Sequence, residues 1–261
     1  MLSKYGKLST TGTISQYMNP YQTVDLKEFE IMFNGKKSSY YGLLVSEYPT
    51  IPCVNEEFEE VPMERRNGNL LIKKGTYKNR ELSIRFKMLD GEFFWSRFKK
   101  AEAWLSNITD NRLLYDRKDK CFIVKRVIFG DISKELRLYG EFEVTFIVKP
   151  FLQDISPFSK TWLENEYIIA NQGDFETLPE IKLYGNGNIQ LTVNDDTFTI
   201  KNVEEEVTIN SELMLCYGKN KESNKLLDMN GGFPVLKKGD NEIVVSSNVT
   251  KTTIKFTNYY R

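Results

Sequence analysis

The fold of this chain is decided by the segment Leu138-Tyr139-Gly140-Glu141-Phe142-Glu143-Val144-Thr145-Phe146-Ile147-Val148, which runs into Lys149-Pro150-Phe151. Its apolar and polar residues alternate with a period of two, which predicts a strand with one core-facing side. A slip of one residue would turn that side outward, so the register is well specified. Pro150 has no amide donor and ends the strand. One amphipathic helix precedes this point and mostly short strands follow it, which predicts two mainly β domains.

Length and composition fit a globular protein. The 261 residues suffice for two cores of ordinary size. Hydrophobic residues make up 40% and charged residues 28% of the chain. No stretch approaches the ~20 apolar residues of a membrane span, and no apolar segment follows Met1-Leu2-Ser3-Lys4 as in a signal peptide. We therefore expect a soluble protein that is made and folded in a cytoplasm.

The residue types exclude most catalytic chemistry. The chain has no histidine, the commonest general base and metal ligand. Cys53, Cys121 and Cys216 are widely separated and show no C-x-x-C spacing, so we predict neither a disulfide framework nor a zinc site. Each cysteine is expected to be a small buried apolar residue. The sequence predicts no catalytic, cofactor-binding or metal-binding residues.

Charge is balanced overall, with 36 basic and 36 acidic residues. Residues 26–151 carry 23 basic and 19 acidic groups, a net +4, whereas residues 152–261 carry 11 and 16, a net −5. Neither half has the charge density of a nucleic-acid-binding protein. We interpret the basic pairs as solvated surface; they are Arg65-Arg66, Lys73-Lys74, Lys99-Lys100 and Lys125-Arg126.

The first half is predicted to be a sheet with one helix. Residues 1–25 have too few periodic apolar positions for a core element, so we interpret them as an arm that orders against a partner. Residues 29–33 are predicted to form a strand, Asn34-Gly35 is the strongest kind of short-range hairpin signal, and residues 42–45 are the expected return strand. Further strands are expected at 56–61, 70–72, 82–86, 112–115 and 121–124.

The helix is predicted over residues 91–106. Asp90 can cap it, and Glu92 suits the positive end of its dipole. One stripe is apolar and is expected to dock on the sheet rather than to line a ligand groove. Its members are Phe94, Phe98, Ala101, Trp104 and Leu105.

The second half is predicted to be an antiparallel sandwich. After a connector at 152–170, residues 171–261 contain regularly spaced short strands with Gly- and Asn-rich turns between them. The expected core consists of their alternating apolar residues: Ile181, Leu183, Ile189, Leu191, Val193, Phe198, Ile200, Val207, Ile209, Leu213, Leu215, Ile243, Val245, Ile254 and Phe256.

Across residues 26–261 the sequence resembles the distal tail proteins of long-tailed phages that infect Gram-positive bacteria. The order and spacing of several segments carry the resemblance. In the first half they are Phe33-Asn34-Gly35, Gly42-Leu43, Arg66-Asn67-Gly68-Asn69-Leu70-Leu71, Trp104-Leu105 and Phe142-Glu143-Val144-Thr145-Phe146 leading into Pro150-Phe151. In the second half they are Asn171-Gln172-Gly173, Leu178-Pro179-Glu180-Ile181-Lys182-Leu183-Tyr184-Gly185, Asn186-Gly187-Asn188-Ile189, Gly232-Phe233-Pro234-Val235-Leu236 and Gly239-Asp240-Asn241-Glu242-Ile243.

The resemblance implies a virion protein of the tail tip, or baseplate, synthesised in the bacterial host cytoplasm. Residues 26–151 would form a hexameric ring, and residues 171–261 a galectin-like sandwich that projects outward. The ring would join the tail tube protein to the tail-tip hub or tail-associated lysin and to receptor-binding proteins for host attachment. DNA would pass through the lumen during genome ejection without specific binding, so we expect a lumen that is not strongly positive. No catalysis, cofactor or membrane is implied.

Two other functions remain open at this point. A carbohydrate-binding adhesion protein could stack sugar rings on Trp162, Tyr184 or Tyr217, although the chain has no histidine such as galectins use. Hydrolysis by paired carboxylates needs no histidine, and the visible acidic clusters are Asp195-Asp196 and Glu204-Glu205-Glu206. We interpret both clusters as solvated surface, because they lie at a turn and before a strand.

Overall fold

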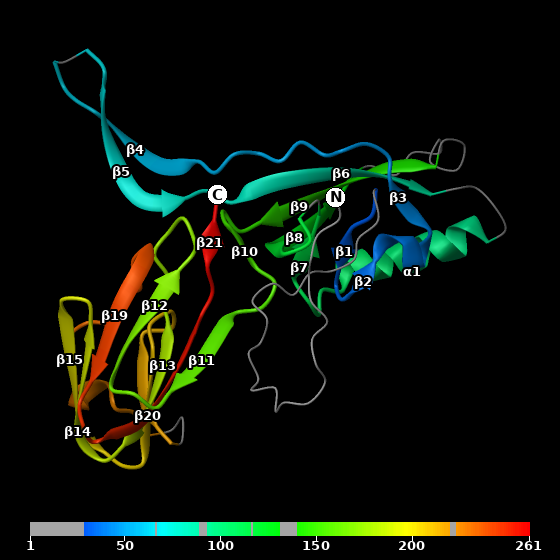
Figure 1. Ribbon diagram of the computed structural model, residues 1–261. Helices are drawn as coiled ribbons and strands as arrows, with labels where there is room; N and C mark the ends of the chain where they lie inside the picture. Colours follow the sequence, from blue (N-terminus) through cyan, green and yellow to red (C-terminus); the bar gives the residue numbers. More distant parts are fainter. Residues whose placement is uncertain (1–28, 66, 89–92, 116, 131–139, 220–222) are drawn as a thin grey trace, which may run out of the picture.

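A computed structural model describes residues 29–65, 67–88, 93–115, 117–130, 140–219 and 223–261. The described chain is mainly β, as predicted, with two packed regions and a projecting hairpin (Figure 1). The arm at 1–25, the Asp90 cap with Glu92, and Leu138-Tyr139 lie outside the described residues.

The first packed region is an antiparallel sheet centred on the strand that the sequence singled out. Strand β9 (Glu141–Val148) lies between β6 (Arg80–Met88) and β8 (Lys120–Phe129). Its residues Phe142, Val144, Phe146 and Val148 are buried, which confirms the alternation. The sheet order is β2-β1-β7-β8-β9-β6-β3, with β1 at Met32–Phe33, β2 at Lys36–Lys37, β3 at Leu43–Val45 and β7 at Arg112–Leu114.

Helix α1 (Phe94–Ser106) covers one face of this sheet. All five residues of the predicted apolar stripe are buried in the core that the helix shares with the sheet. The rings of Phe98 and Phe142 lie 5.3 Å apart and make an edge contact. No helix in the described part of the chain is long and apolar enough to cross a membrane.

The hairpin at Asn34-Gly35 is present, but its return strand differs from the prediction. Asn34 and Gly35 take positive φ values of 49° and 71°, and β1 pairs with β2 directly across the turn. A 3₁₀-helix (η1, Ser38–Tyr41) then leads the chain away from β1. As a result, the predicted return strand, β3, pairs with β6 at the opposite edge of the sheet.

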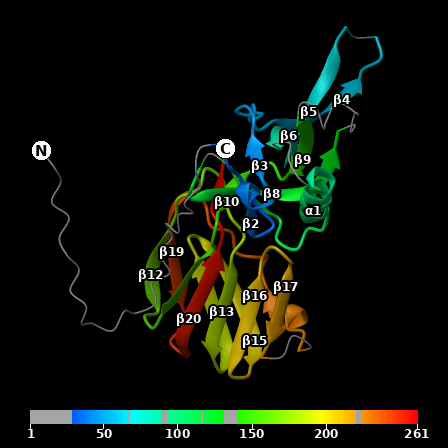
Figure 2. The same ribbon diagram turned by 90° about the vertical axis from the view of Figure 1, so that its right-hand side faces the viewer.

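Strands β4 (Glu56–Pro62) and β5 (Asn69–Tyr77) were predicted as strands, but they do not join this sheet. They pair only with each other, among the described residues, as a two-stranded sheet. Figures 1 and 2 show this hairpin projecting away from both packed regions.

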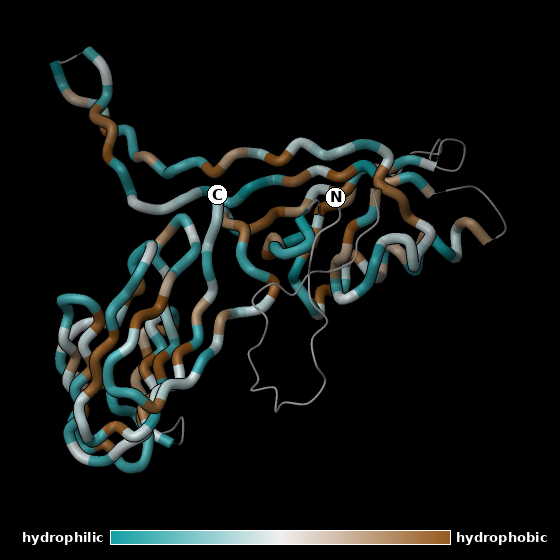
Figure 3. Tube along the Cα trace, in the orientation of Figure 1, coloured by the Kyte–Doolittle hydropathy of each residue, from teal (hydrophilic) through white to brown (hydrophobic). Residues whose placement is uncertain are grey.

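The second packed region is a sandwich of two five-stranded antiparallel sheets. Figure 3 shows hydrophobic segments along its strands. One sheet has the order β11-β20-β13-β16-β17, at Phe158–Trp162, Val249–Phe256, Glu180–Gly185, Glu206–Asn210 and Leu215–Gly218. The other has the order β12-β19-β14-β15-β18, at Glu166–Asn171, Gly239–Val245, Gly187–Val193, Asp196–Val203 and Met229–Asn230. A 3₁₀-helix (η2, Leu226–Asp228) precedes β18.

The predicted core of the sandwich is buried except at two positions. Leu213 lies in the turn before β17 and Leu215 begins that edge strand; their side chains are 63% and 46% exposed. Their alternation predicts core positions, and the structure contradicts this prediction. At an edge strand that follows a tight turn, alternation does not ensure a covering layer.

The segment 152–170, expected as a connector, contains three strands. Two of them, β11 and β12, pair with β20 and β19 and thus belong to the sandwich. The third, β10 (Leu152–Asp154), pairs both with β8 and with β21 (Tyr259–Tyr260). The end of the chain therefore returns to the first packed region.

Candidate functional site

The β4–β5 hairpin exposes apolar side chains on both of its faces. Leu70, Leu71 and Ile72 are consecutive in β5 and are 48%, 55% and 45% exposed. Successive side chains of a strand point to opposite faces, so this run places apolar groups on each side. Phe58 on β4 and Met63 just after it are exposed as well. Single exposed apolar residues are ordinary on protein surfaces, whereas such a group on one element is typical of an interaction site.

Backbone pairing and polar side-chain contacts hold the two strands of this hairpin in register. Lys73 Nζ lies 3.2 Å from Glu56 Oε2, and Thr76 Oγ1 donates to Glu57 Oε2 at 2.8 Å. These contacts are solvent-exposed, so each contributes at most about 1 kcal/mol. An isolated two-stranded sheet is marginally stable in water. The hairpin is thus suited to be covered by another protein surface.

The base of the hairpin is fixed by aromatic rings from both packed regions. Tyr77, the last residue of β5, makes edge contacts with Phe151 at 4.9 Å and with Phe175 at 5.3 Å. The rings of Phe151 and Phe175 are 4.1 Å apart, and Tyr259 lies 6.0 Å from Phe151. This cluster holds the root of the hairpin at the junction between the sheet and the sandwich.

Asp154 organises a polar contact across the same junction. Its carboxylate accepts a hydrogen bond from Asn258 Nδ2 at 2.8 Å and lies 3.3 Å from Lys120 Nζ. The Lys120 ammonium also lies 3.5 Å from the centre of the Tyr260 ring. Asp154, Lys120 and Tyr260 come from β10, β8 and β21, so strand pairing and these side chains fix the sandwich to the sheet together.

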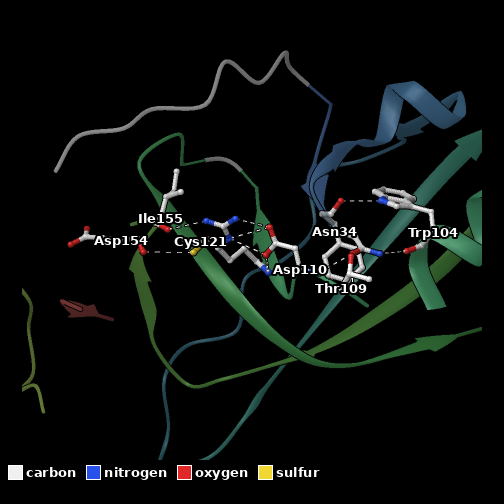
Figure 4. A network of polar contacts seen from close by, with 9 residues as sticks. Asn34, Trp104, Thr109, Asp110, Cys121, Asp154 and Ile155 are labelled. Carbon is white, nitrogen blue, oxygen red and sulfur yellow. Dashed lines mark hydrogen bonds and ion pairs between the residues drawn. The ribbon is translucent and has the colours of Figure 1, made fainter. Parts of the chain in front are cut away.

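A second polar network ties the first hairpin to the end of helix α1 (Figure 4). Asn34 Nδ2 donates to the carbonyl oxygens of Trp104 and Asn107, at 2.9 and 2.6 Å. Asn34 Oδ1 accepts from the backbone N–H groups of Thr109 and Asp110 and from the Thr109 hydroxyl. One side chain therefore satisfies two of the carbonyls at the end of the helix.

Trp162 does not join the other aromatic residues considered for sugar binding, whereas Tyr184 and Tyr217 lie on the outward face of one sheet. Trp162 is buried and stacks on Tyr167, with the ring centres 4.5 Å apart. Tyr184 lies between the ammonium groups of Lys182 and Lys251, at 5.1 and 3.9 Å from its ring centre. The structure does not bring Trp162 to the surface that Tyr184 occupies.

The two acidic clusters considered for hydrolysis lie at opposite ends of β15. Asp195 lies in the turn between β14 and β15, and Asp196 begins β15. Glu205 pairs with Lys219, and Glu206 pairs with Lys182 at 2.9 Å. The described residues contain no group of acidic, cysteine or histidine side chains arranged to hold a metal ion.

Two of the three cysteines match the prediction of burial. Burial raises the pKa of the Cys121 thiol to about 12 and that of Cys216 to about 11, so both stay protonated at neutral pH. Cys53 is exposed, contrary to the prediction, because it lies in the extended segment between β3 and β4. The described members of the basic pairs are spread over the hairpin, α1 and β8.

No protein-family model matches the sequence, and no curated protein sequence matches it significantly. Among solved structures, the chain is similar to the Dit (gp 19.1) protein of phage SPP1, described as a paradigm of the hub adsorption apparatus in phages infecting Gram-positive bacteria. The TM-score is 0.64 and the identity 14%, over 90% of this chain and 100% of that chain.

Two structures of the phage p2 baseplate in its activated conformation, with Sr and with Ca, are more distant. Their TM-scores are 0.44 and 0.42; each is 11% identical over 88% of this chain and 97% of the p2 chain. The similarity to SPP1 Dit spans both packed regions. It confirms, at the level of the fold, the resemblance to phage hub proteins that the sequence indicated.

Proposed function

We propose that this protein is a structural hub of a phage tail tip. In this proposal it forms a hexameric ring that joins the tail tube to the tip and receptor-binding proteins and leaves a channel for the genome. The sandwich would be the galectin-like domain that projects outward. The role is one of assembly rather than catalysis.

The observation that carries the proposal is the β4–β5 hairpin on a chain with the Dit fold. Its apolar side chains are exposed on both faces, so burying them requires another molecule. A projecting element that docks on a different surface of the next copy makes a heterologous contact, and such contacts close into a ring when the rotation permits. The aromatic cluster at Tyr77 fixes the direction in which the hairpin projects, which a closed ring needs.

The test is assembly of the full-length protein with and without the apolar surface of the hairpin. We expect the protein, mixed with the matching tail tube protein, to form six-membered rings in negative-stain images and the corresponding mass in mass photometry. The variant Leu70→Ser with Leu71→Ser should remain monomeric. The matched control is Ile168→Ser, because Ile168 is 68% exposed on the sandwich; this variant should form rings like the parent.

Two results would overturn the proposal. One is ring formation by the hairpin variant at the parent concentration. The other is a parent protein that stays monomeric even in complete tail-tip particles. Circular dichroism on each variant distinguishes loss of assembly from loss of folding.

A further inference from the structure

Strand β12 forms an open edge of the sandwich (Figure 2). Among the described residues it pairs only with β19, along the whole of Glu166–Asn171. The other three edge strands are less open. Lys225 N–H donates to the Cys216 carbonyl along the edge of β17, β18 is two residues long, and β11 carries Lys160 at its centre. Short edges and central lysines discourage pairing with other chains, so β12 is the edge most suited to it.

The hydrogen bonds of β19 show which backbone groups of β12 face this edge. In an antiparallel strand the N–H and C=O of one residue point to the same side, and the side alternates along the strand. Val245 N–H donates to the Asn165 carbonyl at 2.8 Å, so the odd-numbered residues point their backbone groups toward β19. The backbone groups of Glu166, Ile168 and Ala170 therefore face the open edge. Within the described chain these three N–H and three C=O groups have no strand partner.

The side chains of the same three residues lie on the outer face of the sandwich. Tyr167 and Ile169 are buried in its core, whereas Glu166, Ile168 and Ala170 are exposed. Ile168 stands in the middle of the open edge with 68% of its surface exposed. A β-branched apolar side chain on an unpaired edge favours the addition of another strand.

We propose that β12 pairs with the β12 of a second copy of this chain, antiparallel and about a two-fold axis at Ile168. In this register Ile168 lies opposite the partner's Ile168, and Glu166 lies opposite the partner's Ala170. Each of these opposite pairs exchanges two backbone hydrogen bonds, so every open N–H and C=O of the three residues is satisfied in both copies. In no other antiparallel register do these three residues pair only with one another.

The side chains favour this register. Opposite residues have Cβ atoms about 5 Å apart, so the two copies of Ile168 cover each other. The two Glu166 carboxylates are displaced by four residues, about 13 Å, which exceeds the Debye length at physiological ionic strength. An axis at Glu166 would instead place two carboxylates opposite each other. An axis at Ala170 would place Ile168 opposite Gln172, whose N–H already donates to Asn258 Oδ1 at 3.2 Å.

The contact joins two five-stranded sheets into one continuous sheet. It is isologous, so it closes after two copies and leaves no β12 edge open to other chains. The buried strip is narrow, and we expect a Kd of the order of 10–100 µM. The pairing uses neither the β4–β5 hairpin nor the first packed region, so it goes beyond the proposed ring and does not depend on it.

Sedimentation velocity of the full-length protein tests the pairing. The starting protein is the variant Leu70→Ser with Leu71→Ser, which lacks the hairpin surface proposed for the ring. We expect a monomer at the nanomolar concentrations of mass photometry and a dimer at about 100 µM. Adding Ile168→Pro should weaken the dimer at least about tenfold, because proline removes an N–H that faces the open edge rather than β19.

Two results of this experiment would overturn the proposal. One is a starting protein that stays monomeric at about 100 µM. The other is a dimer of unchanged affinity after Ile168→Pro, with circular dichroism showing that the variant is folded. The ring is tested separately: if the parent forms no rings while the starting protein still dimerises, only the ring proposal fails.

Charge variants at one position test the register. Ala170 lies opposite the partner's Glu166, and two such pairs form in each dimer. Ala170→Lys should therefore tighten the dimer about three- to tenfold, and Ala170→Glu should weaken it by a similar factor. Both variants leave the backbone groups of β12 intact, so they remain informative if the proline variant does not fold. Equal affinities, or a tighter dimer for Ala170→Glu, would contradict the register.

Disulfide formation locates the two-fold axis. Ile168→Cys and Leu163→Cys are made in the starting protein with Cys53→Ser, which removes the exposed native thiol. Leu163 is the matched control because it is 72% exposed but lies five residues before the axis, too far from its copy for a disulfide. With oxidised glutathione, two thiols lose two hydrogens and the glutathione is reduced. We expect Ile168→Cys to link at least about tenfold faster, and equal rates would overturn the proposal.

Discussion

Strands β5 and β6 are neighbours in sequence and equal in length, at nine residues each, yet they have opposite surroundings. Along β6 every second side chain is buried, including Leu82, Ile84 and Phe86, because helix α1 and the other strands cover that face. Along β5, Leu70 and Leu71 are about half exposed. Apolar residues favour a strand, but the strand is stable only where other parts of the protein cover its apolar face. For β5 the described part of the chain supplies no such layer.

The largest expected effect is a truncation in the packed sheet. Phe146 is fully buried in β9, and its ring lies 5.3 Å from that of Phe33. Phe146→Ala should lower the free energy of unfolding by about 3–5 kcal/mol, because it removes buried apolar surface and leaves a cavity. The control is Phe58→Ala in the hairpin, which should change it by less than about 1 kcal/mol. Urea unfolding of both variants measures the two changes in the free energy of unfolding. Equal losses of stability would contradict the difference between the packed sheet and the hairpin.

The next effect concerns the polar cap of the helix within the packed region. Asn34→Ala removes five hydrogen bonds and places alanine at a φ of 49°, which asparagine tolerates better. We expect a loss of about 2–3 kcal/mol in urea unfolding. Asn34→Asp keeps the acceptor and loses the donor, so it should lie between the parent and the alanine variant. An alanine variant as stable as the parent would show that water replaces the network.

A smaller effect is expected at the exposed margin of the same network, and it depends on pH. Hydrogen bonds from Arg112 lower the pKa of Asp110 below its usual 3.8. The ionised carboxylate therefore stabilises the fold above the unfolded pKa, and this contribution is lost as the pH falls through the folded pKa. Asp110→Asn should cost less than about 1 kcal/mol at pH 7 and almost nothing once the pH is below the folded pKa of Asp110. If the parent protein and Asp110→Asn still differed in stability in acid, the stabilising role of the ionised Asp110 carboxylate would be contradicted.

The smallest effect on folding is expected in the hairpin itself. Leu71→Ser should change the free energy of unfolding of the monomer by no more than about 0.5 kcal/mol, because the side chain is already 55% exposed. Thermal unfolding of the dilute monomer measures this. A loss of stability above about 1 kcal/mol would show that the hairpin packs on its own chain. In that case β5 and β6 would no longer differ in how they are covered.

The sequence predicts well which side of a strand or helix is buried, but it predicts poorly which strands pair with each other. Alternation identified the buried side of β9, and spacing identified the buried stripe of α1, because both signals are local. The partner of β3 was predicted incorrectly, since η1 displaces the strand and pairing with β6 spans more than forty residues. Strands β10 and β11 were missed for a related reason: they are three and five residues long and carry few alternating apolar residues.

The candidate site was less predictable than the fold. Strands at 56–61 and 70–72 were expected, but their isolation from the sheet was not. The available signal was Leu70-Leu71-Ile72, three consecutive apolar residues opposite a strand with four glutamates, since neither face of such a pair resembles a core. The exposure of Cys53 and the junction at Asp154 depend on contacts between distant segments, which no local pattern encodes.

The sandwich is attached to the sheet by two lengths of chain that leave from the same place. Strand β10 leads into it and β21 leads out of it, and Leu152 pairs with Tyr260 where they lie side by side. A load applied to the sandwich passes through the covalent link at β10, which pairs with β8, and the pairing of β21 with β10 adds a second, non-covalent attachment at the same place. Because entry and exit coincide, a sandwich of another size or sequence can be exchanged at this point without altering the path of the sheet.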